Sequence, residues 1–279
     1  MPAYANLAGV EVGDRLPVRL VGAINVSPES FYKGSVAATE YALWQRAEAM
    51  VGEGADILDI GALSTAPYLA TEITEAEEAR RLVWALGVLR KGVSVPISAD
   101  TRRSRVALAA LEAGAQVVND VSGLRQDPAM ARVIAEHAIG AILMASETTP
   151  GAADPPRAVQ ELLAESLSLA AAGGIPLDQV VVDPGIGFFR RGAVSWEVWD
   201  CEVLRRLAEL KALNRPILVG LSRKSFIGKI LQKEDPSDRL AGSLAATAIA
   251  VANGAHLIRT HDVGATRDAI RMAEALRAP

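Results

Sequence analysis

The stretch VRLVGAIN (18–25), with the helical segment that follows it and the run DILDIG (56–61), sets the pattern of the whole chain. Each run is short and apolar, ends in a polar residue or glycine, and precedes a segment of helical character. Six further runs of this kind follow: VPISAD (95–100), AQVVND (115–120), GAILMAS (140–146), QVVVDPG (179–185), PILVGLS (216–222) and HLIRTH (256–261). Eight strand–helix units predict a parallel sheet of the α/β class, closed into a (β/α)₈ TIM barrel.

The length of 279 residues suits one barrel domain over residues 1–279, because such barrels take about 250 residues. Residues 1–17 contain Gly9, Gly13 and Pro17 and predict a short N-terminal hairpin or cap. Spacing and capping residues predict helices over 39–54, 74–92, 104–114, 127–138, 156–173, 197–213, 237–254 and 262–278.

Composition argues against several classes of protein. A formal net charge of −4 gives no reason to expect nucleic-acid binding. The single cysteine, Cys201, excludes an internal disulfide, and three histidines with one cysteine are too few for an ordinary zinc site. No apolar stretch reaches the roughly 20 residues of a membrane span, and no secretory signal is visible. We therefore expect a soluble, cytoplasmic protein that contacts neither nucleic acid nor membrane.

The chemistry of a TIM barrel is carried by the carboxyl ends of its strands and the loops after them. Polar side chains at those ends should converge here, namely Asn25, Asp100, Asn119, Asp183, Lys224, Arg259 and His261. Two of the loops, 25–36 and 61–73, are longer than packing requires. Such loops are often lids or substrate loops.

Asp100 and Asp183 each end a buried apolar run, where an unpaired carboxylate costs several kcal/mol. Together with Asn119 they favour a flat heterocycle that carries N–H donors and a carbonyl. The alternative is that each aspartate caps the following helix. We expect Asp120 to be structural and to bond the amides of its own loop.

The segment GLSRKSFIG (220–228) places Ser222 and Lys224 at a strand end, just before a helix predicted to begin at Ser225. Hydroxyls, a lysine and a helix N-terminus suit a small anion. The alternative is a solvated basic turn.

Arg259 and His261 occupy alternate positions of one strand and therefore share a face, which suits a phosphate or diphosphate. The alternative is a histidine bonded to Asp262 and an arginine in a salt bridge. Asn25 could supply an oxygen to Mg²⁺, which needs few protein ligands when it bridges phosphates. Phe188 could flank a ring or simply pack its loop.

Several motifs resemble the dihydropteroate synthase family, folate-pathway enzymes of the pterin-binding group. They are NVSPESF (25–31), GADILDIGALSTAP (54–67), DVSGL (120–124), VVDPGIGF (181–188), GLSRKSFIG (220–228), GSLAA (242–246) and IRTHDV (258–263). The resemblance runs from about residue 18 to the end of the chain. It implies condensation of 6-hydroxymethyl-7,8-dihydropterin diphosphate with p-aminobenzoate or a related arylamine, with release of diphosphate.

The resemblance also implies roles for individual residues. The pterin would be held by Asp100, Asn119, Asp183 and Lys224, with Met144 on its face and Phe188 nearby. The diphosphate would be held by Arg259, His261 and Mg²⁺ on Asn25. Ser222 would receive the arylamine carboxylate, and Thr65 would border both substrates. The catalytic roles would fall to Asp100, Lys224, Arg259 and His261, and the family pattern implies a homodimer.

The chain departs from the family pattern in both long loops. Lys33 stands where the family has an aspartate, and Ala66 stands where it has an arginine, an arrangement that suggests an archaeal-type variant. We hypothesise that Lys33 supplies the positive charge near the diphosphate. Two other functions remain open: a methyltransferase that uses methyltetrahydrofolate, and a non-catalytic pterin-binding protein.

Overall fold

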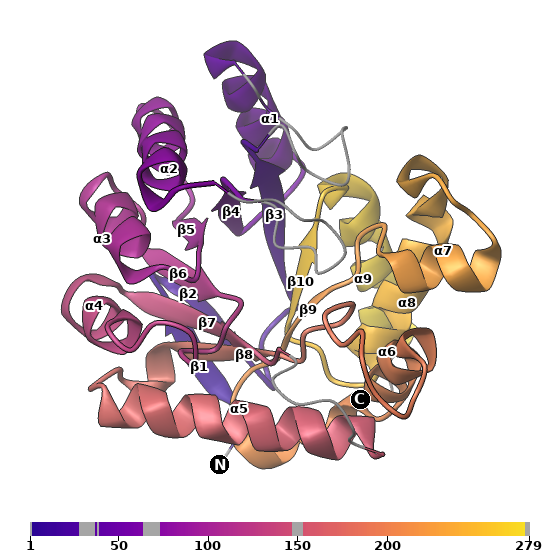
Figure 1. The fold of residues 1–279 in the computed structure, drawn as a ribbon. Helices are drawn as coiled ribbons and strands as arrows, with labels where there is room; N and C mark the ends of the chain where they lie inside the picture. The colour runs from indigo at the N-terminus through magenta and orange to yellow at the C-terminus, as the bar shows by residue number, and fades with distance from the viewer. Residues whose placement is uncertain (1, 28–36, 38, 64–72, 147–152, 277–279) are drawn as a thin grey trace.

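The computed structural model describes residues 2–27, 37, 39–63, 73–146 and 153–276. Eight parallel strands form its centre, and their bounds are β3 (Arg19–Asn25), β4 (Ile57–Gly61), β5 (Ile97–Asp100), β6 (Val117–Asp120), β7 (Gly140–Met144), β8 (Val180–Asp183), β9 (Leu218–Gly220) and β10 (Leu257–Thr260). They pair in the order β8-β7-β6-β5-β4-β3-β10-β9. A single bridge between Val182 and Ile217 joins β8 to β9 and completes the ring. The predicted TIM barrel is therefore confirmed (Figure 1).

Alternation along the strands divides the barrel interior into an apolar end and a polar end. The apolar end is one cluster of fully buried side chains, among them Val21, Ile57, Val117, Ile142, Val181, Leu218 and Leu257. Two residues further along several strands, the inward positions change to polar residues, such as Asp59 after Ile57 and Asn119 after Val117. The strand sequences thus place polar groups at the carboxyl end.

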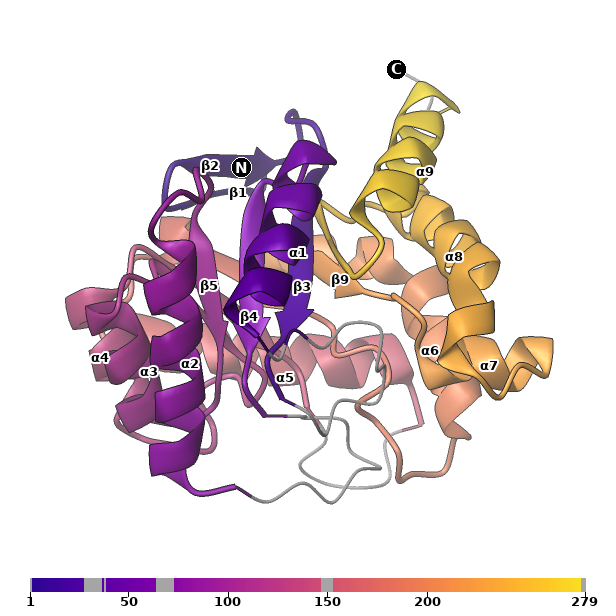
Figure 2. The ribbon, with the colours of Figure 1, turned by 90° about the horizontal axis from the view of Figure 1, so that it is seen from above.

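A hairpin closes the apolar end. Strands β1 (Tyr4–Leu7) and β2 (Val10–Gly13) pair antiparallel within the segment expected to form a hairpin or cap. Ala8 and Gly9 both adopt positive φ in the two-residue turn, as a type I′ hairpin requires. Leu7 is fully buried with the apolar cluster of the strands. Figure 2 shows the hairpin at the end of the barrel opposite to the carboxyl ends of β3 and β4.

Helices surround the ring, with bounds α1 (Glu40–Gly52), α2 (Glu75–Leu89), α3 (Ser104–Glu112), α4 (Met130–His137), α5 (Pro155–Ala172), α6 (Trp196–Arg205), α7 (Ser225–Leu231), α8 (Leu240–Ala252) and α9 (Val263–Leu276). Thr39 and Thr74 cap α1 and α2 through their side chains, as their positions indicate. Among the described residues, no helix is long and apolar enough to cross a membrane.

The helix expected over 197–213 is not continuous. The chain leaves the α conformation at Arg206 (φ −107°, ψ 22°), and residues Leu207–Leu213 continue as a 3₁₀ helix. Arg206 bonds Glu209 and Asp154 from this bend. The helix expected over 237–254 likewise begins with a 3₁₀ turn, Pro236–Arg239, because Pro236 and the Asp235 cap favour a tight start.

Candidate active site

Asp100 ends β5 and is buried, and its carboxylate accepts a hydrogen bond from Arg259 Nη2 at 3.0 Å. The capping alternative is wrong for this residue, because α3 begins after Arg103 without a side-chain cap. Burial, followed by the charge of Asp59, raises the pKa of Asp100 to about 7. Its buried Oδ1 atom has no hydrogen-bond partner among the described residues, which leaves an acceptor at the strand end.

Asp183 ends β8 and accepts a hydrogen bond from the amide of Gly185 at 2.8 Å. Burial raises the pKa of this carboxyl, although the nearby positive charge of Lys224 opposes the shift. Met144, which ends β7, is the register partner of Asp183 and is also buried. Asp120 is structural, as expected, because it accepts from the amides of Ser122 and Leu124 in its own loop.

A carboxylate that the motif analysis did not single out lies between the predicted residues. Asp59 on β4 is 0% exposed. Its Oδ2 atom accepts from Arg259 Nε at 2.6 Å and from Asn119 Nδ2 at 3.1 Å. The signal was present in DILDIG, since an aspartate at an inward position of a buried strand needs a partner.

Arg259 lies inside the barrel and forms salt bridges with Asp59 and Asp100. The alternative that placed this arginine in a salt bridge is therefore confirmed. Burial lowers the pKa of this guanidinium, but the two carboxylates outweigh burial and raise it. The arginine is therefore a permanent cation at the barrel mouth. Its position is set by two acids.

His261 follows β10 and is buried. Burial, followed by the charge of Arg259, lowers its pKa to about 4. Its Nδ1 lies 3.0 Å from the carbonyl of Ala23, and since a carbonyl only accepts, Nδ1 carries the proton. The predicted alternative bond to Asp262 is wrong, because Asp262 pairs with Arg223 at 2.8 Å.

Lys224 follows β9 and precedes α7, and its ammonium donates to the carbonyl of Ile186. The ammonium also lies 5.0 Å from the ring centroid of Phe188. Burial lowers the pKa of Lys224 to about 8, opposed by Asp183 and Asp200. Phe188 thus packs in its loop beside the lysine.

Asp200 is a second residue that the sequence did not single out. It is fully buried on α6 and accepts from the amide of Gly187 at 2.8 Å, which fixes the loop after β8. Burial raises the pKa of its carboxyl to about 6. Arg190 in the same loop bonds Ser225 at the start of α7. The loops after β8 and β9 are therefore fastened together around Lys224.

The predicted anion segment is more ordered than a solvated basic turn. Arg223 is buried and pairs with Asp262, so that alternative is wrong for this residue. Ser222 Oγ accepts from the amide of His261 at 3.3 Å and lies 3.4 Å from Asp262. Ser222 and His261 are therefore adjacent at the ends of neighbouring strands β9 and β10.

Asn25 ends β3 opposite Gly61 on β4. A Cβ atom at Gly61 would lie 3.3 Å from Asn25 Oδ1 and 3.6 Å from Asp100 Oδ2. Because glycine has no side chain, the amide oxygen of Asn25 and a carboxylate oxygen of Asp100 both border the space beside Gly61. Lys33, Thr65 and Ala66 lie outside the described residues.

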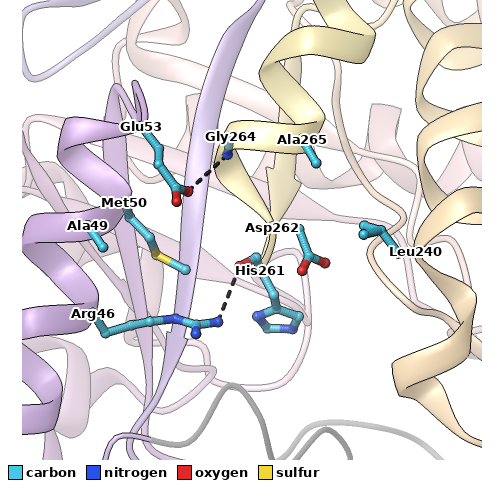
Figure 3. A pocket seen from close by; sticks show the side chains of 9 residues that line it. All are labelled: Arg46, Ala49, Met50, Glu53, Leu240, His261, Asp262, Gly264 and Ala265. Atoms are coloured by element: carbon cyan, nitrogen blue, oxygen red, sulfur yellow. Dashed lines mark hydrogen bonds between the residues drawn. The ribbon is translucent and has the colours of Figure 1, made fainter.

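A pocket of about 290 Å³ lies on the outer side of this site, between α1 and α9. His261 lines it together with Arg46, whose Nη2 donates to the carbonyl of His261 at 3.2 Å (Figure 3). Glu53 bonds the amide of Gly264 on the opposite wall. The pocket is distinct from the barrel mouth, and the two share His261.

Comparisons with known proteins agree with this geometry. A family model described as pterin binding enzyme matches residues 21–261. The dihydropteroate synthase of Synechocystis is 38% identical over 264 residues, which cover 92% of this chain and 89% of that protein. The corresponding Mycobacterium leprae protein is 36% identical over 272 residues and 93% of each chain.

Solved structures give the same result. A Coxiella burnetii dihydropteroate synthase in complex with pteroic acid has a TM-score of 0.87 at 34% identity and covers 99% of both chains. A Xanthomonas albilineans dihydropteroate synthase with 4-aminobenzoic acid also has a TM-score of 0.87, at 35% identity over 100% of both chains. These relatives are named as synthases, which leaves the methyltransferase alternative without support. The chain therefore belongs to the pterin-binding enzyme family and, within it, to the dihydropteroate synthases.

Proposed function

We propose that this protein joins 6-hydroxymethyl-7,8-dihydropterin diphosphate to p-aminobenzoate or a related arylamine. The bond between the pterin methylene carbon and the diphosphate oxygen breaks, and the oxygen leaves with the electron pair. The amine nitrogen forms the new bond to carbon and then loses a proton to solvent. The site must therefore bind a ring, favour positive charge on it, and stabilise a departing anion.

The observation that carries this proposal is the meeting of acids and cations at one barrel mouth. Asp100 and Asp183 offer carboxylate oxygens to the N–H groups of a pterin, and Asn119 offers an amide. Negative charge from both acids favours cationic character on the ring as the diphosphate leaves. Lys224, beside Asp183, suits the ring carbonyl. Alignment within this pocket lowers the barrier without a strong general base, because an arylamine attacks unprotonated.

Arg259 is the residue best suited to the leaving group, since its charge is permanent at every physiological pH. His261, two residues further along the chain, is our second proposed contact for the diphosphate, as a hydrogen-bonding group. Ser222, next to His261, is our proposed contact for the arylamine carboxylate. Thr65 and Lys33 keep their proposed roles at the two substrates, with Lys33 adding positive charge near the diphosphate.

Mg²⁺ fits the oxygen donors at the end of β3. Asn25 Oδ1 and the Asp100 carboxylate flank Gly61, and hard oxygen ligands are those that Mg²⁺ prefers. No group of three or more acidic, histidine or cysteine side chains suitable for a metal occurs among the described residues. We propose that Asn25 holds the ion, which when bound would neutralise charge on the diphosphate.

We further propose a homodimer built on α8 and α9, which pack against each other. Ile249 on α8 is 56% exposed and Met272 on α9 is 60% exposed, and a second copy packed here would remove these apolar side chains from water. Ile249→Glu should give a monomer in analytical ultracentrifugation, whereas Leu169→Glu on α5 should leave the assembly unchanged. The cytoplasmic location remains a prediction.

The activity is tested by mixing the protein with the pterin diphosphate, p-aminobenzoate and Mg²⁺ and measuring diphosphate release and pteroate formation together. Methyl transfer from methyltetrahydrofolate is measured in parallel. Equal amounts of diphosphate and pteroate support the proposal. Binding of pteroic acid without turnover would instead support the non-catalytic alternative. Methyl transfer alone would overturn the proposal.

A further inference from the structure

Asp59 lies deeper in the barrel than the residues that face the substrates. It precedes Gly61 by two residues, and Gly61 is in register with Asp100, which in turn is in register with Asn119. The side chain is 0% exposed, so it has no direct access to solvent. Its effect on the reaction must pass through the groups that it contacts.

Those contacts join the two halves of the proposed site. A single oxygen, Asp59 Oδ2, accepts from Asn119 Nδ2 at 3.1 Å and from Arg259 Nε at 2.6 Å. Asn119 belongs to the ring-binding half and Arg259 to the leaving-group half. Arg259 reaches Asp100 through a different nitrogen, Nη2, at 3.0 Å. Asp59 therefore engages one nitrogen of the guanidinium while Asp100 engages another.

The contact with Asn119 also decides which way the amide faces. A carboxylate only accepts hydrogen bonds, so the amide nitrogen must point at Asp59. One N–H is used in that bond, which leaves the carbonyl oxygen and the second N–H for a ligand. A neighbouring acceptor and donor match the edge of a ring that carries an amino group beside an unprotonated ring nitrogen. Without Asp59, the amide could rotate by half a turn and lose this match.

We propose that Asp59 is a positioning residue of the reaction, which orients the Asn119 amide for the pterin and holds Arg259 for the diphosphate through one shared oxygen. This inference rests on the proposed function. Charge-assisted hydrogen bonds of this kind are roughly twice as strong as bonds between neutral groups, so their loss should be visible in kinetics.

The test compares Asp59→Asn with Ser98→Ala. Ser98 is the register partner of Asp59 on β5, is also 0% exposed, and its hydroxyl has no hydrogen-bond partner. We expect Asp59→Asn to reduce kcat/KM for the pterin diphosphate by about 10- to 100-fold, from two weakened charge-assisted bonds. The KM for p-aminobenzoate and all parameters of Ser98→Ala should stay within about twofold of wild type.

A double-mutant cycle separates positioning from a general structural defect. Asn119→Ala is measured alone and in the Asp59→Asn background, by kcat/KM and by the affinity for pteroic acid. If Asp59 acts through the amide, the second substitution costs at least fivefold less in the Asp59→Asn background. Fully additive effects, or an Asp59→Asn enzyme that behaves like Ser98→Ala, would overturn the inference.

Asn119→Asp provides a second route if Asp59→Asn does not fold. This change keeps the size of the side chain but turns an acceptor toward Asp59, so it should weaken pteroic acid binding more than Asn119→Ala does. Wild-type affinity in Asn119→Asp would overturn the inference. A wild-type protein that neither binds pteroic acid nor releases diphosphate would overturn the proposed function. Failure of the proposed function is therefore seen in the wild type, whereas failure of the inference about Asp59 is seen only in the variants.

Discussion

The two ends of this barrel are built from the same eight strands but satisfy opposite requirements. At the amino end, inward residues such as Ile57 and Val117 form an apolar cluster sealed by Leu7 of the hairpin. At the carboxyl end, inward residues are charged, and buried atoms without partners include Asp59 Oδ1 and Asp100 Oδ1. Unsatisfied buried polar atoms are costly and rare. We therefore expect stability to be concentrated at the apolar closed end and chemistry at the polar open end.

The largest effect expected from this division is the loss of activity in Lys224→Met. Lys224 is half-buried, and in its proposed role loss of its charge should cost about 4 kcal/mol, so kcat/KM should fall by roughly a thousandfold. The free energy of unfolding in urea should change far less, because Asp183 can take up a proton. Lys229→Met, an exposed lysine of α7, is the control and should behave as wild type. Equal losses of stability and activity would contradict the division.

Leu7→Ala tests the closed end. Removing a fully buried leucine side chain should lower the free energy of unfolding by about 2–5 kcal/mol. Well below the melting temperature, kcat/KM should remain unchanged, because the hairpin lies opposite to the site. Tyr4→Ala removes an exposed side chain from the same strand and should cost less. If kcat/KM falls together with the free energy of unfolding in these two variants, the two ends are coupled and the prediction is wrong.

The raised pKa of Asp100 should make the free energy of unfolding depend on pH. Its pKa rises from 3.8 to about 7 on folding, so between these values the folded state binds a proton that the unfolded state lacks. The contribution of this residue to stability therefore falls as the pH rises from about 4 to about 7. Asp100→Asn has no carboxyl group to titrate at this position. Its free energy of unfolding should therefore rise relative to that of wild type between about pH 4 and about pH 7. Urea unfolding at pH 4.5 and pH 7.5 measures the difference, and a constant difference would contradict the prediction.

The smallest effect concerns Asp200, which acts on Lys224 from α6. Lys224 has a pKa of about 8 and is supported in its charged form by Asp183 and Asp200. Asp200→Asn keeps an acceptor for Gly187 but removes the charge, so the pKa of Lys224 should fall further. The alkaline limb of the rate profile should then move to lower pH by a fraction of a unit. Glu202→Gln, on the same helix, should leave the limb in place.

The barrel and the family were predictable from the sequence, because eight apolar runs end at regular positions and the motifs are specific. Asp100, Asn119, Asp183 and Arg259 also lie at the barrel mouth as expected. A salt bridge of Arg259 was one of the two alternatives, but its partner Asp59 could not be predicted, since that residue lies 200 residues away in the chain. The lowered pKa of His261 was likewise hidden, because burial and a neighbouring charge decide it rather than residue type.

The pairing of β3 with β10 has a consequence for how the protein is made. Arg19 is the register partner of Leu257, so the ring closes only when its last strand is available. A ribosome that adds roughly 5–20 residues per second leaves β3 waiting roughly 10–50 seconds for that partner. During this interval one edge of a hydrophobic strand is open to neighbouring chains.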